Sequence, residues 1–211
     1  MTKPSRKNEE IEKIRESIID GAVGIIHAEG FAGMTMRRLA SRMGMSATNL
    51  YNYFSNKDEL YINILIRGFR NLYGLLKSAS DSSADPIERS RHFIRAYLSF
   101  GIENFNYYEI MFSPSLPKYN DYVGTPHEAL ASVEMDFSRK IIGLSVEAVA
   151  GVLNARKDGG SGKVERRLIE VWSMLHGMIS LYNSKMIDYV IEKPVTTYES
   201  IIDDIIHYIN S

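Results

Sequence analysis

Apolar residues recur at spacings of three and four along nearly the whole chain, and no long stretch alternates between apolar and polar positions. Spacings of three and four mark one face of an α-helix, whereas alternation would indicate a strand. At the start of the chain the pattern predicts an amphipathic helix over about 9–29, ended by Gly30. Its apolar positions are Ile11, Ile14, Ile18, Ala22 and Ile25. The chain is therefore expected to be all-α, with about nine helices.

Two short amphipathic pieces follow this first helix. They are MTMRRLASRM over 34–43 and SATNLYNYF over 46–54, and Gly44 with Met45 joins them. Thr35 and Ser46 suit the position before each helix, where a side-chain oxygen accepts a hydrogen bond from a free backbone N–H. Two short helices with a tight glycine-containing turn predict a helix-turn-helix.

Helical periodicity continues to the C-terminus, interrupted by small, polar or proline-rich tracts. SASDSSADP over 78–86 is the clearest linker, and its final Asp-Pro suits the start of the next helix. The remaining helices are expected over about 57–78, 86–104, 107–112, 126–156, 163–185 and 197–210, with loops at 113–126 and 158–162. This pattern predicts a helix-turn-helix DNA-binding domain at 1–57, a connecting helix at 57–78 and a larger helical domain at 79–211.

The net charge of the chain is only −1, but its charges are unevenly placed. Residues 1–57 hold nine Lys and Arg against six Asp and Glu, whereas the other residues hold sixteen against twenty. The stretch 30–57 has no acidic side chain, and its positive side chains are Arg37, Arg38, Arg42 and Lys57. A basic N-terminal lobe on a mildly acidic body indicates contact with nucleic acid through one end of the molecule.

Several classes of protein are disfavoured by what the sequence lacks. It has no cysteine, which excludes disulfides and thiolate metal sites. No apolar run approaches the roughly 20 residues of a membrane span, and the polar start MTKPSRKNEE is unlike a signal peptide, so we expect a cytoplasmic protein without membrane contact. No nucleophile–base pair, paired carboxylates, phosphate loop or metal-ligand spacing stands out. We therefore expect neither an enzyme nor a bound metal or cofactor.

The run TMRRLASRMGMSATNLYNYFSNKDEL over 35–60 resembles the DNA-binding signature of the TetR family of transcriptional repressors. With the flanking helices, the resemblance covers about residues 11–65. The chain departs from the family pattern at Met36, where a small polar residue is common, and at Ala47, where many relatives carry a polar side chain. The resemblance implies double-stranded operator DNA as the partner. It also implies that this DNA is contacted by Thr35, Met36, Arg37, Ser46, Ala47, Thr48, Asn49, Tyr51, Asn52, Tyr53 and Lys57.

The second short helix presents a set of side chains that can reach base edges. Leu50 and Phe54 lie four residues apart and are expected to face the core. The other faces then carry Ala47, Thr48, Asn49 and Asn52. Asparagine can pair with adenine through two hydrogen bonds, and the methyl groups of alanine and threonine can meet a thymine methyl.

The remaining polar positions suit guanine or the DNA backbone. Arg37 is expected to read guanine from the start of the first short helix, whose N-terminus beside Thr35 suits a phosphate. Tyr51 and Lys57 also suit phosphate contact. The alternatives are a solvated face for Arg38 and Arg42, and a packing role for Tyr53.

Near the C-terminus, Trp172, His176 and Gly177 form W-x-x-x-H-G within VWSMLHGMISLY. This motif resembles the C-terminal ligand-binding domain of a TetR subgroup in which Trp, His and Gly recur on one helix. Gly177 would allow a neighbouring helix to approach closely, and His176 is either a core histidine or a ligand contact. Methionine and aromatic side chains adapt to varied apolar ligands. We expect a pocket for a mostly apolar small effector, lined by Tyr97, Met111, Met135, Trp172 and His176.

The last predicted helix carries a broad apolar stripe, formed by Ile201, Ile202, Ile205, Ile206 and Ile209. One helix-turn-helix covers half a site, and dimers bind two half-sites. We expect a homodimer through the last two helices that buries this stripe, with packing inside the chain as the alternative. The expected function is a repressor that a mostly apolar effector releases from its operator. The alternatives are a helical interaction protein or a ligand-independent regulator with the same fold.

Overall fold

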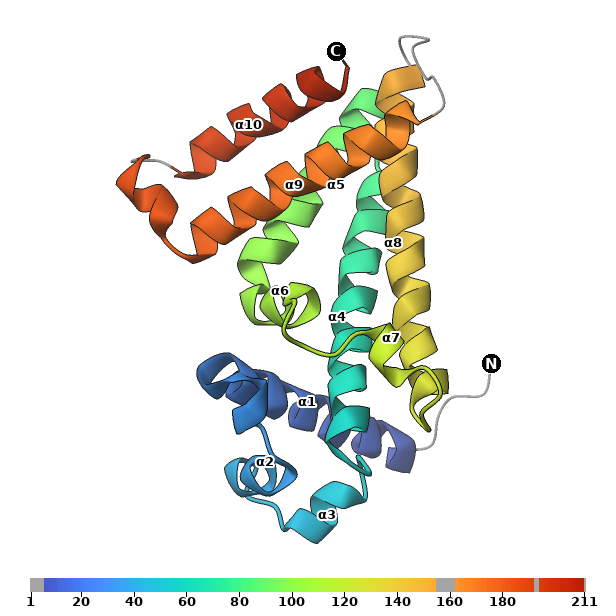
Figure 1. The fold of residues 1–211 in the computed structure, drawn as a ribbon, viewed down its shortest axis with the longest axis vertical. Coiled ribbons are helices and arrows are strands. Elements are labelled where there is room, and N and C mark those ends of the chain that lie inside the picture. Colours follow the sequence, from blue (N-terminus) through green and yellow to red (C-terminus); the bar gives the residue numbers. More distant parts are fainter. Residues whose placement is uncertain (1–5, 155–161, 192–193, 211) are drawn as a thin grey trace. The chain divides into compact units, whose positions relative to one another are not determined.

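The computed structural model describes residues 6–154, 162–191 and 194–210, which form ten α-helices, one 3-10 helix and no strand (Figure 1). The expected all-α fold is confirmed, with the one-turn helix α7 added inside a tract expected to be a loop. The expected break at 158–162 lies outside the described residues except for Gly162. The helices are α1 Arg6–Gly33, α2 Met36–Arg42, α3 Ala47–Tyr51, α4 Lys57–Ser80, α5 Pro86–Glu103, α6 Phe105–Phe112, α7 Tyr119–Tyr122, α8 Glu128–Asn154, α9 Lys163–Asn183, η1 Met186–Tyr189 and α10 Pro194–Ile209.

The chain divides into two compact units. The N-terminal unit comprises Met1–Phe69 and Asn106–Met135, and the C-terminal unit comprises Arg70–Phe105 and Asp136–Ser211. Helices α4 and α8 therefore contribute residues to both units. The expected domains are divided by function, with boundaries at residues 57 and 79. The compact units have other boundaries, because residues 106–135 pack with the first helices. The domains by role stay a prediction.

The first three helices enclose a small apolar core. The side chains at its centre are completely buried, namely Ile18, Ala22, Ile25, Leu39, Leu50 and Phe54. Gly30 interrupts the helical run of α1 with φ 74° and ψ 169°, which confirms that the regular helix breaks there. Because only glycine adopts such a conformation at little cost, this residue sets where the chain turns towards α2.

The turn between α2 and α3 is built from the local signals seen in the sequence. The Thr35 hydroxyl accepts a hydrogen bond from the Arg38 backbone N–H at 3.2 Å, and that of Ser46 accepts one from the Asn49 N–H at 3.1 Å. Both predicted helix caps are thus confirmed. Gly44 has φ 64° and ends α2 in a left-handed conformation that glycine adopts readily.

The segment between α6 and α8 is tied to the start of α4 inside the N-terminal unit. The Tyr61 hydroxyl donates to the Pro117 carbonyl at 3.1 Å. The Asn56 side-chain amide and His127 Nε2 lie 3.2 Å apart, so the short connection between α3 and α4 is also held. The expected loop is therefore present apart from α7, and side-chain hydrogen bonds attach it to the unit that contains the helix-turn-helix.

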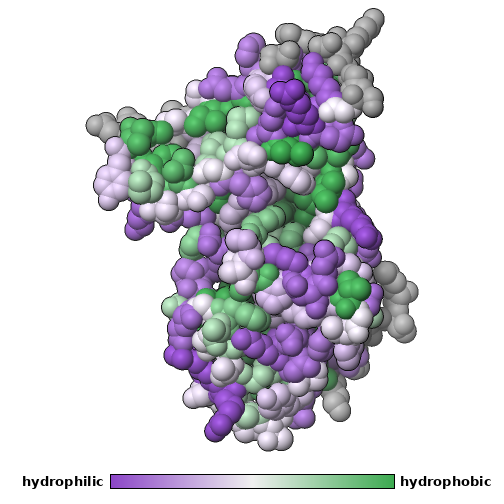
Figure 2. Space-filling view, viewed as in Figure 1, coloured by the Kyte–Doolittle hydropathy of each residue, from purple (hydrophilic) through white to green (hydrophobic). Residues whose placement is uncertain are grey.

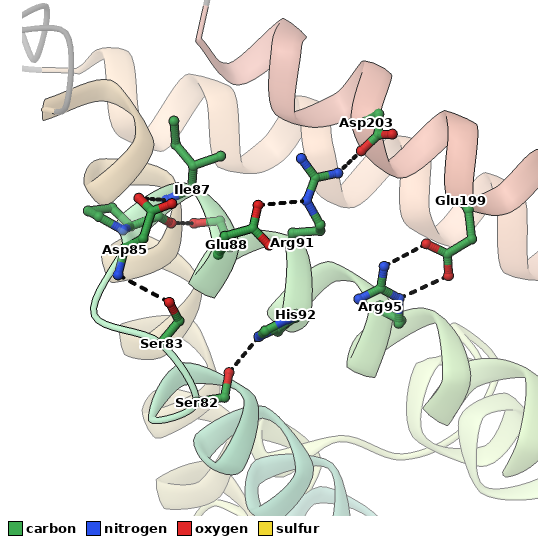
Figure 3. A network of polar contacts seen from close by, with 12 residues as sticks. Ser82, Ser83, Asp85, Ile87, Glu88, Arg91, His92, Arg95, Glu199 and Asp203 are labelled. Atoms are coloured by element: carbon green, nitrogen blue, oxygen red, sulfur yellow. Dashed lines mark hydrogen bonds and ion pairs between the residues drawn. The ribbon is translucent and has the colours of Figure 1, made fainter.

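In the C-terminal unit α10 packs on α5 and α9. Two arginines of α5 reach across to α10: Arg91 pairs with Asp203, and Arg95 pairs with Glu199 at 2.6 Å (Figure 3). Such partly exposed ion pairs are individually weak, so they fix the register of α10 more than they add stability. Close packing of α5 on α9 is marked by Gly101, where an added Cβ would lie 2.4 Å from Ile179.

The isoleucine stripe of α10 is already buried inside the chain. Ile202, Ile205, Ile206 and Ile209 are at most 6% exposed, while Ile201 is half-buried. The expectation that this stripe forms the surface between two subunits is therefore wrong, and the alternative of packing within the chain holds. The stripe faces inward because a helix with a broad apolar face packs wherever partners are available, and α5 and α9 supply them.

Candidate nucleic-acid interface

Two buried side chains determine which faces of α3 are presented to solvent. Leu50 of α3 and Phe54 are 0% exposed, so both face the core as expected, although the helix ends at Tyr51 and is shorter than the expected 46–54. The side of this five-residue helix that faces away from the core carries Thr48 and Asn49, which are exposed, while Ala47 is half-buried. The outward placement of the proposed base-reading side chains is thus confirmed, while their contact with DNA stays a prediction.

The flanks of α3 place further members of the predicted set at the surface. Ser46 and Asn52 are exposed, and Tyr51 is 48% exposed, a large fraction for an aromatic side chain. Tyr53 is half-buried, so DNA contact and packing against the core both stay predictions for this side chain. Ser46 precedes α3 in the chain, Tyr51 ends it, and Asn52 and Tyr53 follow it.

Helix α2 contributes one outward arginine and one buried methionine. Arg37 is exposed, and no described residue forms an ion pair or hydrogen bond with its side chain. Met36, by contrast, is only 6% exposed. Since Thr35 caps the helix, Met36 is its first residue and turns towards the core, which removes its side chain from the predicted contact set.

The other cations of the acid-free stretch differ in their surroundings. Arg38 is exposed and pairs with Glu29 at 2.6 Å, in agreement with a solvated face. Arg42 is exposed too. Lys57, expected to contact phosphate, is instead half-buried: its ammonium donates to the Phe31 carbonyl at 2.6 Å and lies 3.8 Å from the centre of the Phe31 ring.

A fifth cation, Arg15 of α1, also reaches the helix-turn-helix. Its guanidinium donates to the Tyr53 carbonyl and lies 4.2 Å from the centre of the Phe54 ring. Sequence reasoning missed this residue because it looked like a surface charge. The available signal was its place directly after Ile14, at the edge of the apolar stripe of the first helix.

The C-terminal unit contains a small apolar cavity between α5, α8, α9 and α10. Its volume is about 20 Å³, and its lining includes Phe93, Trp172 and Ile209. The Ser90 hydroxyl, also at this cavity, donates to the Ala148 carbonyl at 2.8 Å and presents no free donor. A cavity of this size holds about one water-sized sphere, far less than the several hundred Å³ of typical ligand sites.

Of the five side chains expected in a ligand pocket, only Trp172 lines this cavity. Tyr97 and His176 lie one helical turn along α5 and α9, where the Tyr97 hydroxyl and His176 Nε2 are 3.0 Å apart. Burial lowers the pKa of His176 below its ordinary value. Met111 and Met135 belong to the N-terminal unit, where Met111 packs against Gly68 of α4.

The face of α9 that includes Gly177 is open rather than closely packed. A Cβ added at Gly177 would meet no atom within 4 Å, so no helix of the described chain approaches closely there, and the approach of a neighbouring helix stays a prediction. On the same helix Ile169 is 65% exposed and Leu181 is 50% exposed.

Apolar side chains also gather on the surface where α9 leads towards α10 (Figure 2). In this connection Tyr189 is 85% exposed and Val190 is 82% exposed. Together with the open face of α9, they give the C-terminal unit an apolar surface without a partner in the described chain.

Two kinds of site are not found among the described residues. No group of three or more His, Cys, Asp or Glu there is placed to hold a metal ion. In the same residues, no helix combines the length and apolar character needed to cross a membrane.

Two family models match this chain. Residues 18–64 match the bacterial regulatory proteins of the tetR family, and residues 90–205 match the tetracycline repressor-like C-terminal domain. The first match contains the helix-turn-helix, and the second spans more than half of the chain.

Individual relatives agree with these matches. The chain is 30% identical over 115 residues to the transcriptional activator FasR of Mycolicibacterium smegmatis, covering 54% of this chain and 50% of that protein. It is 28% identical over 81 residues to the transcriptional repressor KstR2 of Mycobacterium tuberculosis, covering 38% and 40%. The alignments thus span about half or less of these relatives. A tetR-family regulatory protein of Rhodococcus RHA1 has the same fold, with a TM-score of 0.72, 14% identity and coverage of 92% and 96%.

The half-buried His176 predicts a pH dependence of stability. Because the pKa of His176 is lowered in the folded protein, the unfolded chain binds more protons between the folded value and the ordinary value near 6.5. Stability is therefore lost as the pH falls through this window. The variant His176→Gln should show a fall in Tm from pH 7.5 to 5.5 that is smaller than that of the wild type by a few degrees, measured by circular dichroism. If His176→Gln and the wild type show the same fall in Tm, the prediction is wrong.

Proposed function

The chain belongs to the TetR family of bacterial regulatory proteins, and from this premise we propose that it is a DNA-binding transcriptional regulator that represses from an operator. The observation that carries the proposal is the recognition helix α3, which is held by the completely buried Leu50 and by Phe54 just beyond its end, and whose polar residues are exposed to solvent. A helix with this division of faces fits the DNA major groove. Repression is the activity for which the relative KstR2 is named.

The proposed contacts fall into two groups. Thr48, Asn49 and Asn52 meet base edges, where the asparagines favour adenine, and Arg37 reaches guanine. The DNA phosphates are contacted by residues at the ends of the two short helices. Tyr51, Thr35 and Ser46 are exposed there. Ala47 offers a methyl group to thymine.

We propose that a mostly apolar small molecule releases the repressor. The C-terminal match supports a TetR-like effector domain, and Trp172 lines the apolar cavity within it. Within the TetR family, this proposal assigns the chain to the Trp-His-Gly subgroup. Tyr97 and His176 form a polar pair beside the cavity. A ligand that prefers the non-binding arrangement weakens DNA affinity by its preference for that arrangement.

We further propose a homodimer through α9 and α10. Since the isoleucine stripe is used inside the chain, the surface offered to a partner is the open face of α9 with Ile169 and Leu181. Ser173 and Gly177 lie on this face and are exposed, so two helices could approach closely there. A ligand-independent regulator is the second candidate function, and the small volume of the cavity favours it.

DNA recognition is tested by selecting bound duplexes from a random-sequence pool. We expect enrichment of a two-fold symmetric site, and we expect Arg37→Ala to weaken binding by about 1–3 kcal/mol and to relax the preference for guanine at one position. Fluorescence anisotropy on the selected duplex measures this. Arg139→Ala, at an exposed arginine of the C-terminal unit, should bind as the wild type does. A failure to enrich any sequence would refute the proposed function.

Release by an effector is tested on the same duplex. A panel of apolar small molecules is first screened for those that raise Tm, which identifies binders and the concentration that saturates the protein. At saturation we expect the DNA affinity to fall at least fivefold, as for a coupling of about 1 kcal/mol. A binder that raises Tm but leaves DNA affinity unchanged would favour the ligand-independent regulator.

The dimer surface is tested by adding like charges to it. The double variant Ile169→Arg with Leu181→Arg should shift the mass in solution from that of a dimer to the 24.0 kDa of one chain, measured by light scattering. Val123→Arg is the control, because Val123 is 52% exposed in the N-terminal unit. A double variant that stays dimeric would place the subunit interface elsewhere.

A further inference from the structure

The helix-turn-helix is too small to hold itself in shape. Helix α2 has seven residues and α3 has five, whereas isolated helices need about 12–15 residues to be even marginally stable. The chain enters this pair through the turn after Phe31 and leaves it through the residues after Tyr51. Each of these two connections is held by a cation from one of the long helices beside it.

Arg15 holds the exit from α3. Its guanidinium donates to the Tyr53 carbonyl and lies over the Phe54 ring, so it contacts both a backbone atom and a buried side chain. Phe54 is completely buried, so the second contact ties the guanidinium to the core. Two contacts on adjacent residues fix both the position and the direction of the chain where it leaves the recognition helix.

Lys57 holds the entry to α2 in the same manner. Its ammonium donates to the Phe31 carbonyl at 2.6 Å and lies 3.8 Å from the centre of the Phe31 ring. The far side of this contact is also fixed, because the Phe31 ring meets the ring of buried Tyr61 edge-on at 4.7 Å. The Phe31 carbonyl accepts from the Met34 N–H as well, at 3.3 Å, so Lys57 closes the turn that precedes the cap of α2.

These two cations differ from the arginines exposed on the same module. Arg15 and Lys57 are half-buried, whereas Arg37 and Arg42 are exposed. Burial lowers the pKa of the Lys57 ammonium despite the neighbouring carboxylate of Asp58, as expected of a cation partly withdrawn from water. An ammonium that moved to a DNA phosphate would abandon a carbonyl and an aromatic face that it already satisfies.

We infer that Arg15 and Lys57 are positioning residues, which clamp the two connections of the helix-turn-helix and leave phosphate neutralisation to exposed side chains. This inference rests on the proposed DNA-binding function and reverses the role that the sequence predicted for Lys57. The clamps act in the free protein, before any DNA is bound. Their loss changes how well the recognition helix is placed, while the number of phosphates neutralised stays the same.

The experiment compares affinity with its salt dependence. A residue that neutralises a phosphate contributes about 0.9 to the slope of log affinity against log salt, whereas a positioning residue contributes nothing to it. On the duplex selected by the wild type from a random-sequence pool, Lys57→Met and Arg15→Met should lose about tenfold in affinity at every salt concentration, with the wild-type slope. Lys57→Arg and Arg15→Lys, which keep a cation at each clamp, should recover most of this loss. Lys77→Met removes one charge from a surface ion pair of α4 and should change neither quantity.

A second measurement uses the free protein and needs no DNA. Hydrogen exchange of the α2 and α3 backbone amides should be faster in Lys57→Met and Arg15→Met than in the wild type, and Tm should fall by about 4 °C. If Lys57→Met lowers the salt slope by about 0.9 while its amides stay as protected as in the wild type, Lys57 is a phosphate ligand and the inference is overturned. A wild-type protein that binds no duplex would refute the proposed function, and the exchange rates would still decide whether the clamps exist.

Discussion

The burial of Leu50 and Phe54 is the constraint on which the recognition surface depends. A helix of five residues has no stability of its own, so α3 exists because these two side chains are inserted completely into the core of the first three helices. Once they are inserted, the faces of α3 that point away from the core are determined. The exposure of Thr48, Asn49 and Tyr51 follows from this geometry rather than from their own polarity. Substitutions on the exposed side can therefore change what is read without changing where the helix lies.

The positive side chains of this small module have two kinds of surroundings, which differ in burial. Exposed arginines are hydrated and free to meet an external anion, as Arg37 is. Half-buried cations that hold a carbonyl and a ring have already exchanged their water for protein partners, as Arg15 and Lys57 have. A count of positive residues therefore overstates the charge available to DNA. Neither the net charge of the chain nor that of its first part distinguishes the two kinds.

Local signals allowed the helix-turn-helix to be predicted from sequence, whereas long-range partners could not be. The caps at Thr35 and Ser46, the glycine turn and the inward-facing pair Leu50 and Phe54 each depend on residues within a few positions, and the structure confirms them. The contacts that could not be predicted share one physical cause, because each joins residues that are distant in sequence. The α10 stripe packs on α5 and α9, Lys57 donates to the Phe31 carbonyl, and Tyr61 of α4 holds the tract 113–126 at Pro117. Met36 is the exception, since the cap at Thr35 was a local sign that the next residue begins the helix.

The packing of α10 has a consequence for any effector. The isoleucine stripe closes one side of the apolar cavity at Ile209, and this cavity has a volume of only about 20 Å³. A larger ligand that binds in this cavity must select an arrangement in which α5, α8, α9 and α10 stand further apart. Its apparent affinity is reduced by the rarity of that arrangement in the free protein. The ion pairs from Arg91 and Arg95 to α10 oppose such an opening, although partly exposed pairs of this kind oppose it only weakly. Binding of a ligand in this cavity therefore competes with the packing of α5 on α10. The affinity for such a ligand depends in part on Arg91 and Arg95, which do not line the cavity.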